Sequence, residues 1–423
     1  MERKKPISPS MPADLKYSNR IQVIDAFLSG GALSASDISA QIGLSRQTVM
    51  KSIQFFLRSR LLVSEGKGNS TSVGGKRPEL FALSREKYFL CIALWPQDLR
   101  LHLYTIGKQL VDNLCLTTPL PDSPKAAIDN AGQLALRLLE KNGVAQDNLC
   151  AVSLSTSGTV DYQTGCLKYS SQSPQWGTNV PLKEYLKPWF GQDTLIFLEN
   201  AGKMTARPFL LEPEFSGKRV LVIFSCWGLS SCLMEGGRIL SGKNSLIGEI
   251  GHMIIDPNDR EVCGCGSRGC LERLVSEGRM RRLVERKLAD YPQSALGTRP
   301  QQVTIAEIFR CSQEGDPLAR ELVNYLARVF ATALRNISLV FDPDQIVFQG
   351  DYAQADSFFD RRLREYLGEF QYAPDPFEIR YDRRPLAEMD ALGSYIALTE
   401  RYFDAPDLYM ESEEEAVRQP DFP

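Results

Sequence analysis

Four residues in one short stretch of the chain are suited to binding a metal ion. His252 is followed by Cys263, Cys265 and Cys270. One imidazole and three thiolates form a tetrahedral zinc set, and four protein ligands leave no position for water, so the predicted zinc ion is structural rather than catalytic. Glycines between the cysteines let the backbone fold tightly enough for the thiols to reach one ion. The alternative, core cysteines beside an incidental histidine, is disfavoured by the polar, glycine-rich context.

The remaining seven of the ten cysteines stand in apolar runs such as FLCIAL at 89–94. We therefore expect them to be reduced thiols in the core. The charged N-terminus has no apolar segment behind it, and no window approaches the ~18 apolar residues that a membrane span needs. These features predict a cytoplasmic protein without a membrane partner.

Charge is unevenly distributed along the 423 residues. The first 85 residues hold 13 Lys and Arg against 6 Asp and Glu, whereas the rest of the chain holds 36 against 46. The length predicts two or three domains. A basic N-terminal domain on an acidic body suits a protein of which only the N-terminal part approaches phosphates. Random clustering of charge on a solvated surface is the alternative.

The basic segment has the pattern of a helix-turn-helix. An amphipathic helix is predicted from Asn19 to Gly30, then a short helix capped by Ser34 or Ser36 and ending at Gly43, then a second helix beginning at Arg46. The outward residues near the start of that last helix would meet base edges and phosphates of double-stranded DNA. They are Ser45, Arg46, Gln47, Thr48 and Lys51.

Two extended runs around a Gly- and Ser-rich tip follow, and they predict a β-wing. Lys67, Lys76 and Arg77 would place cations beside the DNA backbone, where each neutralised phosphate adds salt-sensitive affinity. Short helical hairpins are common, so the helix-turn-helix pattern gains its specificity from the wing and from the basic charge around it.

Beyond residue 85, apolar strands alternate with helices, which predicts an α/β architecture. The expected strands include YFLCIAL, LRLHLYTI, LCAVSLS, TLIFLEN, RVLVIFSCWG and QIVFQGD. The expected helices cover about 124–142, 271–290 and 317–340.

Several of these motifs resemble the ROK family (repressor, open reading frame, kinase), and within it the repressor branch. GEIGH at 248–252 and CGCGSRGCLE at 263–272 match the family's GExGH and CxCGxxGCLE. Residues 157–186 are similar to its PGxVD…W…PL segment, and GGKRPELFALS at 74–84 resembles the linker of its repressors. The resemblance implies a two-lobed, hexokinase-like body.

The resemblance also implies that this body has lost the parts a kinase needs. Family kinases carry an Asn-Asp pair whose Asp is the general base, and here Asn200 is followed by Ala201, which cannot accept a proton. In the two phosphate loops, Trp95-Pro96-Gln97 and a turn containing Trp227 replace flexible glycines. We therefore expect no enzyme activity and no bound ATP.

The family's sugar contacts are retained better than its catalytic groups. By resemblance, Asn200, Glu249, His252 and Glu272 would bind a sugar or sugar derivative, with the zinc orienting His252. Alternatively, the two glutamates serve only to support the zinc loop.

The sequence thus predicts a winged helix-turn-helix domain over 1–84 with a basic N-terminal arm, a ROK domain over 85–405, and an acidic tail over 406–423. The first lobe would cover about 85–200 plus the C-terminal helix, and the second about 201–390. The expected function is a DNA-binding regulator, most simply a repressor of a carbohydrate-related operon, acting as a homodimer or homotetramer on a palindromic operator. The alternatives are an active sugar kinase with a fused regulatory head, and a repressor controlled by a protein partner.

Overall fold

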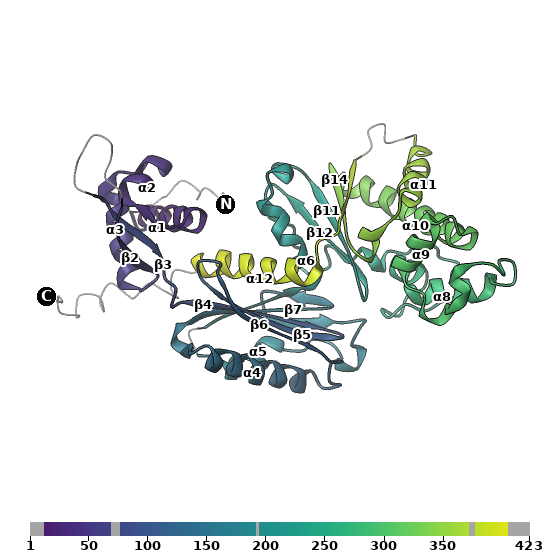
Figure 1. Cartoon of the computed structure of the whole chain (residues 1–423), viewed down its shortest axis with the longest axis horizontal. Helices are drawn as coiled ribbons and strands as arrows, with labels where there is room; N and C mark the ends of the chain where they lie inside the picture. The colour runs from purple at the N-terminus through teal and green to yellow at the C-terminus, as the bar shows by residue number, and fades with distance from the viewer. Residues whose placement is uncertain (1–11, 69–76, 192–193, 372–376, 405–423) are drawn as a thin grey trace.

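The computed structural model describes residues 12–68, 77–191, 194–371 and 377–404, and its elements form three units (Figure 1). The N-terminal unit, here called the head, is followed by two α/β units called the first and second lobes. The basic arm, Lys76 at the wing tip and the acidic tail lie outside the described residues. Within the described residues, no helix is both long and apolar enough to cross a membrane.

The head is three helices against a small antiparallel sheet of order β1-β3-β2. Its first helix begins at Pro12, seven residues before the predicted start, because the polar turn before Asn19 continues the helix with Pro at a position that needs no N–H. The predicted end at Gly30 is confirmed. The elements are α1 (Pro12–Gly30), β1 (Leu33–Ser34), α2 (Ala35–Ile42), α3 (Arg46–Arg58), β2 (Leu62–Lys67) and β3 (Glu79–Leu83).

Caps fix the two helices of the helix-turn-helix, and of the two serines predicted for the first cap the structure selects Ser34. The Ser34 hydroxyl accepts from the Asp37 backbone N–H, and the Asp37 carboxylate accepts from the Ser34 N–H in return. Gly43 ends α2 in the left-handed conformation, with φ of 72°. The Ser45 hydroxyl then caps α3 through the Thr48 N–H at 3.2 Å. Val49 and Ile53 are fully buried against α1, so the opposite face of α3 is turned outward.

The first lobe is built on a mixed sheet of order β10-β7-β4-β5-β6. Its β5 strand alternates buried Leu99, Leu101 and Leu103 with half-exposed residues, as expected for a strand covered on one face. Helices α4 and α5 cover one face and α12 crosses the other (Figure 1). The elements are β4 (Tyr88–Trp95), β5 (Asp98–Thr105), β6 (Leu110–Thr117), α4 (Pro124–Lys141), β7 (Leu149–Thr156), β8 (Thr159–Asp161), β9 (Cys166–Tyr169), α5 (Leu182–Leu186), β10 (Leu195–Asn200) and α12 (Leu386–Phe403).

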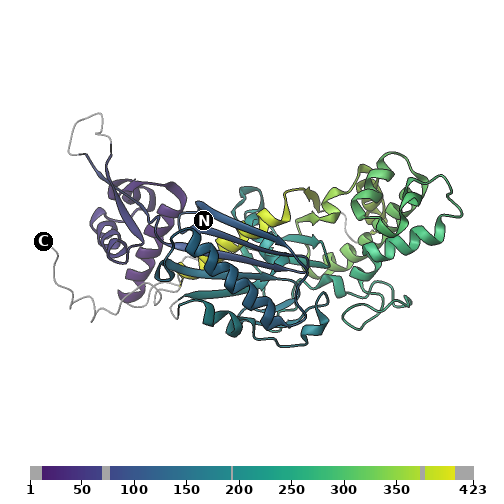
Figure 2. The ribbon, with the colours of Figure 1, turned by 60° about the horizontal axis from the view of Figure 1, so that its bottom comes forward.

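The second lobe has a sheet of order β13-β12-β11-β14-β15, with most of its helices on one face (Figure 2). The predicted helix over 271–290 is two helices, because Ser276 adopts an extended conformation and its hydroxyl caps the second one. The elements are α6 (Ala201–Ala206), β11 (Val220–Ser225), β12 (Leu229–Glu235), β13 (Arg238–Ile239), α7 (Leu271–Val275), α8 (Glu277–Lys287), α9 (Ile305–Gln313), α10 (Pro317–Phe341), β14 (Gln345–Gly350), α11 (Ser357–Gly368) and β15 (Glu378–Asp382).

The mixed α/β fold was predicted correctly, but the prediction for the cysteines outside the metal cluster was wrong in part. Cys115 is exposed on β6, the edge strand of its sheet, and Cys166 and Cys226 are half-buried. An edge strand or a turn leaves a side chain open to solvent even within an apolar run. The other four are buried as expected.

Candidate functional site

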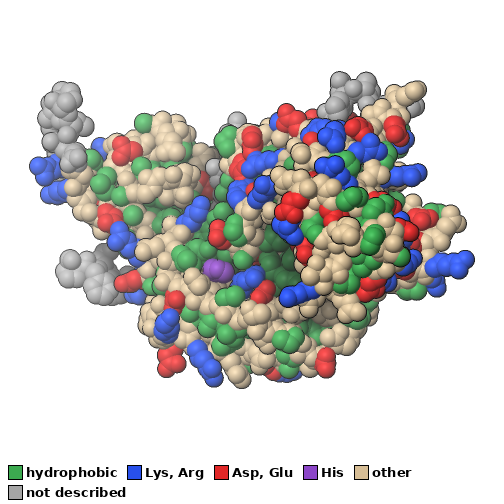
Figure 3. Space-filling view, turned by 45° about the vertical axis from the view of Figure 1, so that its right-hand side comes forward, with side chains coloured by type: hydrophobic (Ala, Val, Ile, Leu, Met, Phe, Trp, Pro, Cys, Tyr) green, Lys and Arg blue, Asp and Glu red, His purple; other side chains and the backbone are tan. Residues whose placement is uncertain are grey.

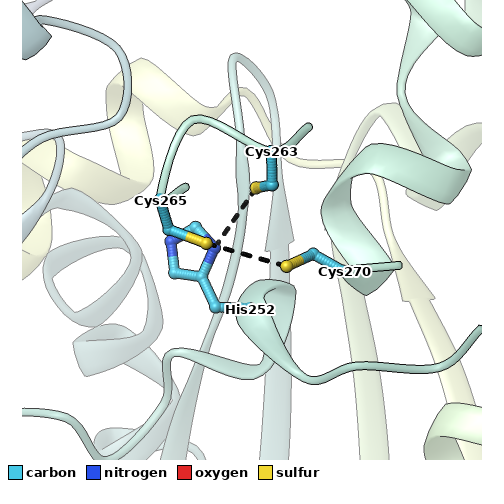
Figure 4. Close-up of side chains that lie close together, drawn as sticks. All are labelled: His252, Cys263, Cys265 and Cys270. Carbon is cyan, nitrogen blue, oxygen red and sulfur yellow. Dashed lines mark hydrogen bonds between the residues drawn. The ribbon is translucent and has the colours of Figure 1, made fainter. Parts of the chain in front are cut away.

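The four predicted metal ligands converge at the edge of the second lobe (Figure 4). His252 ends a short 3-10 turn, Cys263 and Cys265 lie in the following loop, and Cys270 immediately precedes α7. The possible ligand atoms all lie within 4.8 Å of one another. Cys263 Sγ is 3.7 Å from His252 Nδ1, and Cys265 Sγ is 3.7 Å from Cys270 Sγ.

This donor set fits a zinc ion. Zinc–sulfur bonds of about 2.3 Å in a tetrahedron place neighbouring ligand atoms roughly 3.8 Å apart, close to both separations in the cluster. The loop is folded tightly, since the Cys263 N–H donates to the Ser267 carbonyl at 2.8 Å. At Gly269, where φ is +73°, a Cβ would lie 1.9 Å from the Asp256 carbonyl oxygen. The cluster can therefore hold a metal, and zinc remains the prediction.

The metal loop also touches the first lobe. Tyr169 Oη, at the end of β9, donates to the Gly264 carbonyl at 2.6 Å. A Cβ on Gly264 would lie 2.9 Å from Ser171 Cβ, so the two loops pack closely. A metal that orders this loop would therefore support a contact between the lobes.

The amide of Asn200 is occupied by the fold. Its Oδ1 accepts from the backbone N–H groups of Gly202 and Lys203, which caps α6. Its Nδ2 donates to the Gly158 carbonyl at 2.7 Å. The predicted ligand residue thus has a structural function as well.

Glu249 lies within the electrostatic reach of His252 and Glu272, two of the other predicted ligand residues. Burial raises the pKa of its carboxyl, while His252, Lys203 and a hydrogen bond with Thr159 act in the opposite direction. Thr159 follows directly after Gly158, the residue to which Asn200 donates. Asn200 and Glu249 therefore contact adjacent residues at the start of β8.

Glu272 completes the group from the second lobe. Its Oε2 accepts from the Leu229 N–H at 2.9 Å. A Cβ on Gly228 would lie 2.8 Å from this oxygen and 3.3 Å from Gln172 Nε2. The side chains of Gln172 and Glu272 therefore both approach Gly228. The surface is hollowed between the two lobes, with charged side chains at the rim (Figure 3). The arrangement offers carboxylates and amides suited to hydroxyl groups.

The sequence did not identify Gln172 or the pair formed by Lys203 and Glu199. Lys203 Nζ lies 3.7 Å from Glu199 Oε1, and both side chains are about 5% exposed or less. The spacing of four residues was no signal for this ion pair, because Glu199 lies in β10 and Lys203 in α6. No local signal identified Gln172, because its neighbours come from the other lobe.

The two turns expected in place of phosphate loops connect β4 to β5 and β11 to β12. Trp95 ends β4 and is 2% exposed, and Trp227 stands in the turn between β11 and β12. Trp95 packs in one cluster with Ala93 and Ala201, against which Trp227 also packs. Ala201, in the position of the expected base, is 3% exposed and carries no polar group.

The predicted DNA-facing residues of the head lie mainly on its surface. Arg46, Gln47 and Lys51 are exposed along α3, and Lys67 and Arg77 are exposed at the ends of the wing strands. Ser45 and Thr48 are tied to each other by their hydroxyls at 2.9 Å, so they order the start of the helix.

Comparison with known proteins identifies a matching family, several relatives and a solved structure with a similar fold. Residues 117–380 match the profile of the ROK family. The glucokinase of Thermotoga maritima is 26% identical over 52% of this chain and 69% of its own length. The xylose repressor of Caldicellulosiruptor bescii is 21% identical over 91% of this chain and 96% of its own. A crystal structure described as a ROK family transcriptional regulator, a homologue of the E. coli MLC protein, superposes with a TM-score of 0.74 at 20% identity, covering 92% of this chain and 99% of that one.

Proposed function

The chain belongs to the ROK family, and from this premise we propose that it is a DNA-binding transcription regulator whose sugar-kinase-like body senses a ligand without catalysis. The xylose repressor among its relatives matches along nearly the whole chain, head included. The proposed target is a carbohydrate-related operon, and the proposed sign of regulation is repression.

The observation that carries DNA binding is the exposed basic face of a capped recognition helix beside a basic wing. Arg46, Gln47 and Lys51 are directed outward from α3 while Val49 and Ile53 hold the helix in the core. Two copies of the head on a palindromic site would contact half-sites about 34 Å apart, which requires a dimer or larger assembly. The body would set that spacing.

Gel-shift titrations with DNA from the chain's own promoter region test this proposal. Arg46→Ala and Arg77→Ala should each weaken binding about tenfold, and the affinity should fall steeply with salt. Lys243→Ala, an equal change in charge at an exposed position on the second lobe, is the matched control and should bind normally. Salt-insensitive binding, or equal affinity of all the variants, would refute the proposal.

For the body, we propose ligand binding without phosphoryl transfer. Ala201 offers no group to take a proton, and it packs in one cluster with Trp95 and Trp227, which by the family resemblance occupy the turns of the two phosphate-binding loops. ATP turnover with hexoses and N-acetylhexosamines should therefore stay at background. The glucokinase relative makes this assay necessary, and turnover in it would favour the kinase alternative.

The proposed ligand is a sugar or sugar derivative held near Asn200, Glu249, His252 and Glu272. Calorimetry with hexoses, N-acetylhexosamines and sugar phosphates tests it, with Glu249→Gln as the variant expected to lose binding. Heat with none of these compounds would instead favour regulation by a protein partner. The four-ligand cluster would bind zinc as a structural ion that orients His252.

A further inference from the structure

Two tryptophans from different lobes meet at the junction of the body. The rings of Trp95 and Trp227 have centroids 4.9 Å apart at 71°, an edge-to-face contact. Phe224, at the end of β11, adds a second edge-to-face ring 6.4 Å from Trp95. The β4–β5 turn and the β11–β12 turn are thus joined directly by aromatic side chains.

The first lobe fixes Trp95 from several sides. Its Nε1 donates to Ser155 Oγ at 3.4 Å, and the Ser155 hydroxyl donates to the buried Asp390 carboxylate. The Arg100 guanidinium lies 4.9 Å from the ring centroid and is itself held by Asp98 at 2.8 Å. Trp227 is only partly buried and sits in a turn. Trp95 is therefore the fixed half of the pair and Trp227 the half that can separate.

The pair lies at the hinge between the lobes. The chain passes from one lobe to the other where β10 ends and α6 begins at Ala201, and again where β15 leads into α12 at Leu386. Ala201 and Leu386 both pack in the cluster that contains Trp95 and Trp227. A change in the angle between the lobes must therefore disturb these aromatic contacts.

Helix α12 connects this hinge to the head (Figure 1). It starts at Leu386 and crosses α6 so closely that a Cβ on Gly393 would lie 1.8 Å from the Met204 carbonyl oxygen. At its other end, Phe403 belongs to the same buried cluster as Ile24 of α1. Just beyond it, Tyr17 Oη of the head donates to the Asp404 carbonyl at 3.1 Å.

We propose that the Trp95–Trp227 pair is a hinge lock whose state is passed to the DNA-binding head by α12. While the rings touch, the lobes keep one angle and α12 keeps one position. Separation of the rings frees α12 to shift against the head, and one such pair changes the ratio of locked to unlocked molecules by about two- to tenfold. Only the DNA readout of this lock rests on the proposed function.

Hydrogen exchange measured by mass spectrometry on the full chain tests the lock without DNA. Trp227→Ala should speed exchange about two- to tenfold in the β4–β5 turn, along α12 and in α1, whereas Trp227→Phe, which keeps a ring, should stay near the wild type. Helices α4 and α10, remote from the hinge in each lobe, serve as internal controls and should not change. No change at the turn or α12 would overturn the lock, and a change that stops short of α1 would overturn its transmission.

A DNA titration then separates the two proposals. If the lock is correct, Trp227→Ala alters the affinity for promoter DNA by about two- to tenfold and Trp227→Phe does not. Equal affinity of both variants, with the hinge shown by exchange to be loosened, would overturn transmission to the head. Failure of the wild-type chain to bind DNA would reject the regulator proposal, while the exchange measurements would still decide whether the lock exists.

Discussion

At the scale of single residues, Ala201 and the two indoles of Trp95 and Trp227 belong to one packed cluster. Ala201 is buried in the cluster of Trp95, so a carboxylate at this position would be surrounded by apolar neighbours. The nearest cation in sequence, Lys203, is already paired with Glu199. We therefore expect that a carboxylate at position 201 would not by itself confer kinase activity.

We predict that Ala201→Asp destabilises the protein by about 2–4 kcal/mol, because it buries a charge without a partner. ATP turnover should remain at background. Urea unfolding and a coupled ATPase assay with hexoses measure the two effects, and Ala201→Ser, a small neutral change, should cost less. A variant as stable as the wild type with measurable turnover would contradict this prediction.

Asp390 supplies a prediction on pH. Burial raises the pKa of this carboxyl to about 7, and the hydrogen bond from Ser155 opposes the rise only in part. An unfolded Asp titrates near 4, so between about pH 4 and pH 7 the folded state holds a proton that the unfolded state has released. The free energy of unfolding must therefore fall as pH rises through this range, by up to about 1.4 kcal/mol per pH unit.

Asp390→Asn imitates the protonated carboxyl. It should remove the part of the pH dependence of the unfolding free energy that comes from Asp390. Urea unfolding at pH 4.5 and pH 7.5 should show the variant losing about 1–3 kcal/mol less than the wild type over this interval. Asp351, whose pKa burial also raises to about 7, leaves a residual slope in both proteins. Parallel pH profiles for the two proteins would show that Asp390 is not buried as described.

At the scale of elements, α12 is the part on which most of the molecule depends. It covers the sheet of the first lobe, crosses α6 and shares a buried cluster with the head. The crossing with α6 relies on Gly393, because any side chain there would meet the Met204 backbone. The helix caps of the head come from its own residues, whereas its buried cluster continues into the first lobe and α12.

Gly393→Ala should destabilise the protein by about 1–3 kcal/mol, because the backbone of α6 must move to admit a methyl group. Thermal unfolding and hydrogen exchange of α12 measure the loss. Gly368→Ala, at the end of α11 with no atom near its Cβ position, is the matched control and should be neutral or slightly stabilising. Equal stability of the two variants would contradict the close crossing.

At the scale of the whole molecule, the described contacts between the lobes include the crossing of α12 over α6, the aromatic pair at the hinge, and the hydrogen bond from Tyr169 to the metal loop at Gly264. The predicted ligand residues lie in the region of the Tyr169 contact. An ordered metal loop would therefore serve both stability and the response to a ligand.

Removing the metal should lower the melting temperature by about 5 °C or more and increase exchange in residues 169–172. Elemental analysis should find about one zinc per chain before treatment with a chelator. Cys265→Ser should reproduce both effects, and Cys166→Ser, at a half-buried thiol outside the cluster, should reproduce neither. A chain that loses zinc with no change in stability would show that the cluster is incidental.

The features that depend on near neighbours were determined by the sequence alone. The cap at Ser45, the wing strands and the convergence of the metal ligands follow from short spacings, since hydrogen bonds and tight turns act over a few residues. The choice of Ser34 over Ser36 as the other cap was left to the structure. The absence of an Asp after Asn200, where the family's kinases carry their base, was likewise visible in the sequence through the resemblance. The helix break at Ser276 was not, because a serine within a helical pattern is compatible with either continuation or a cap.

Only the tertiary structure decided what those residues do to one another. The sequence placed a tryptophan in each of two turns, but the turns meet because the sheets of two lobes carry them to one hinge. Asp390 acquires its raised pKa from burial beside Ser155, 235 residues away. Glu272 and Gln172 both approach Gly228, because the packing of the two lobes brings their loops together. Such contacts depend on how whole layers pack. A local pattern of residue types does not show which distant residues will be brought together.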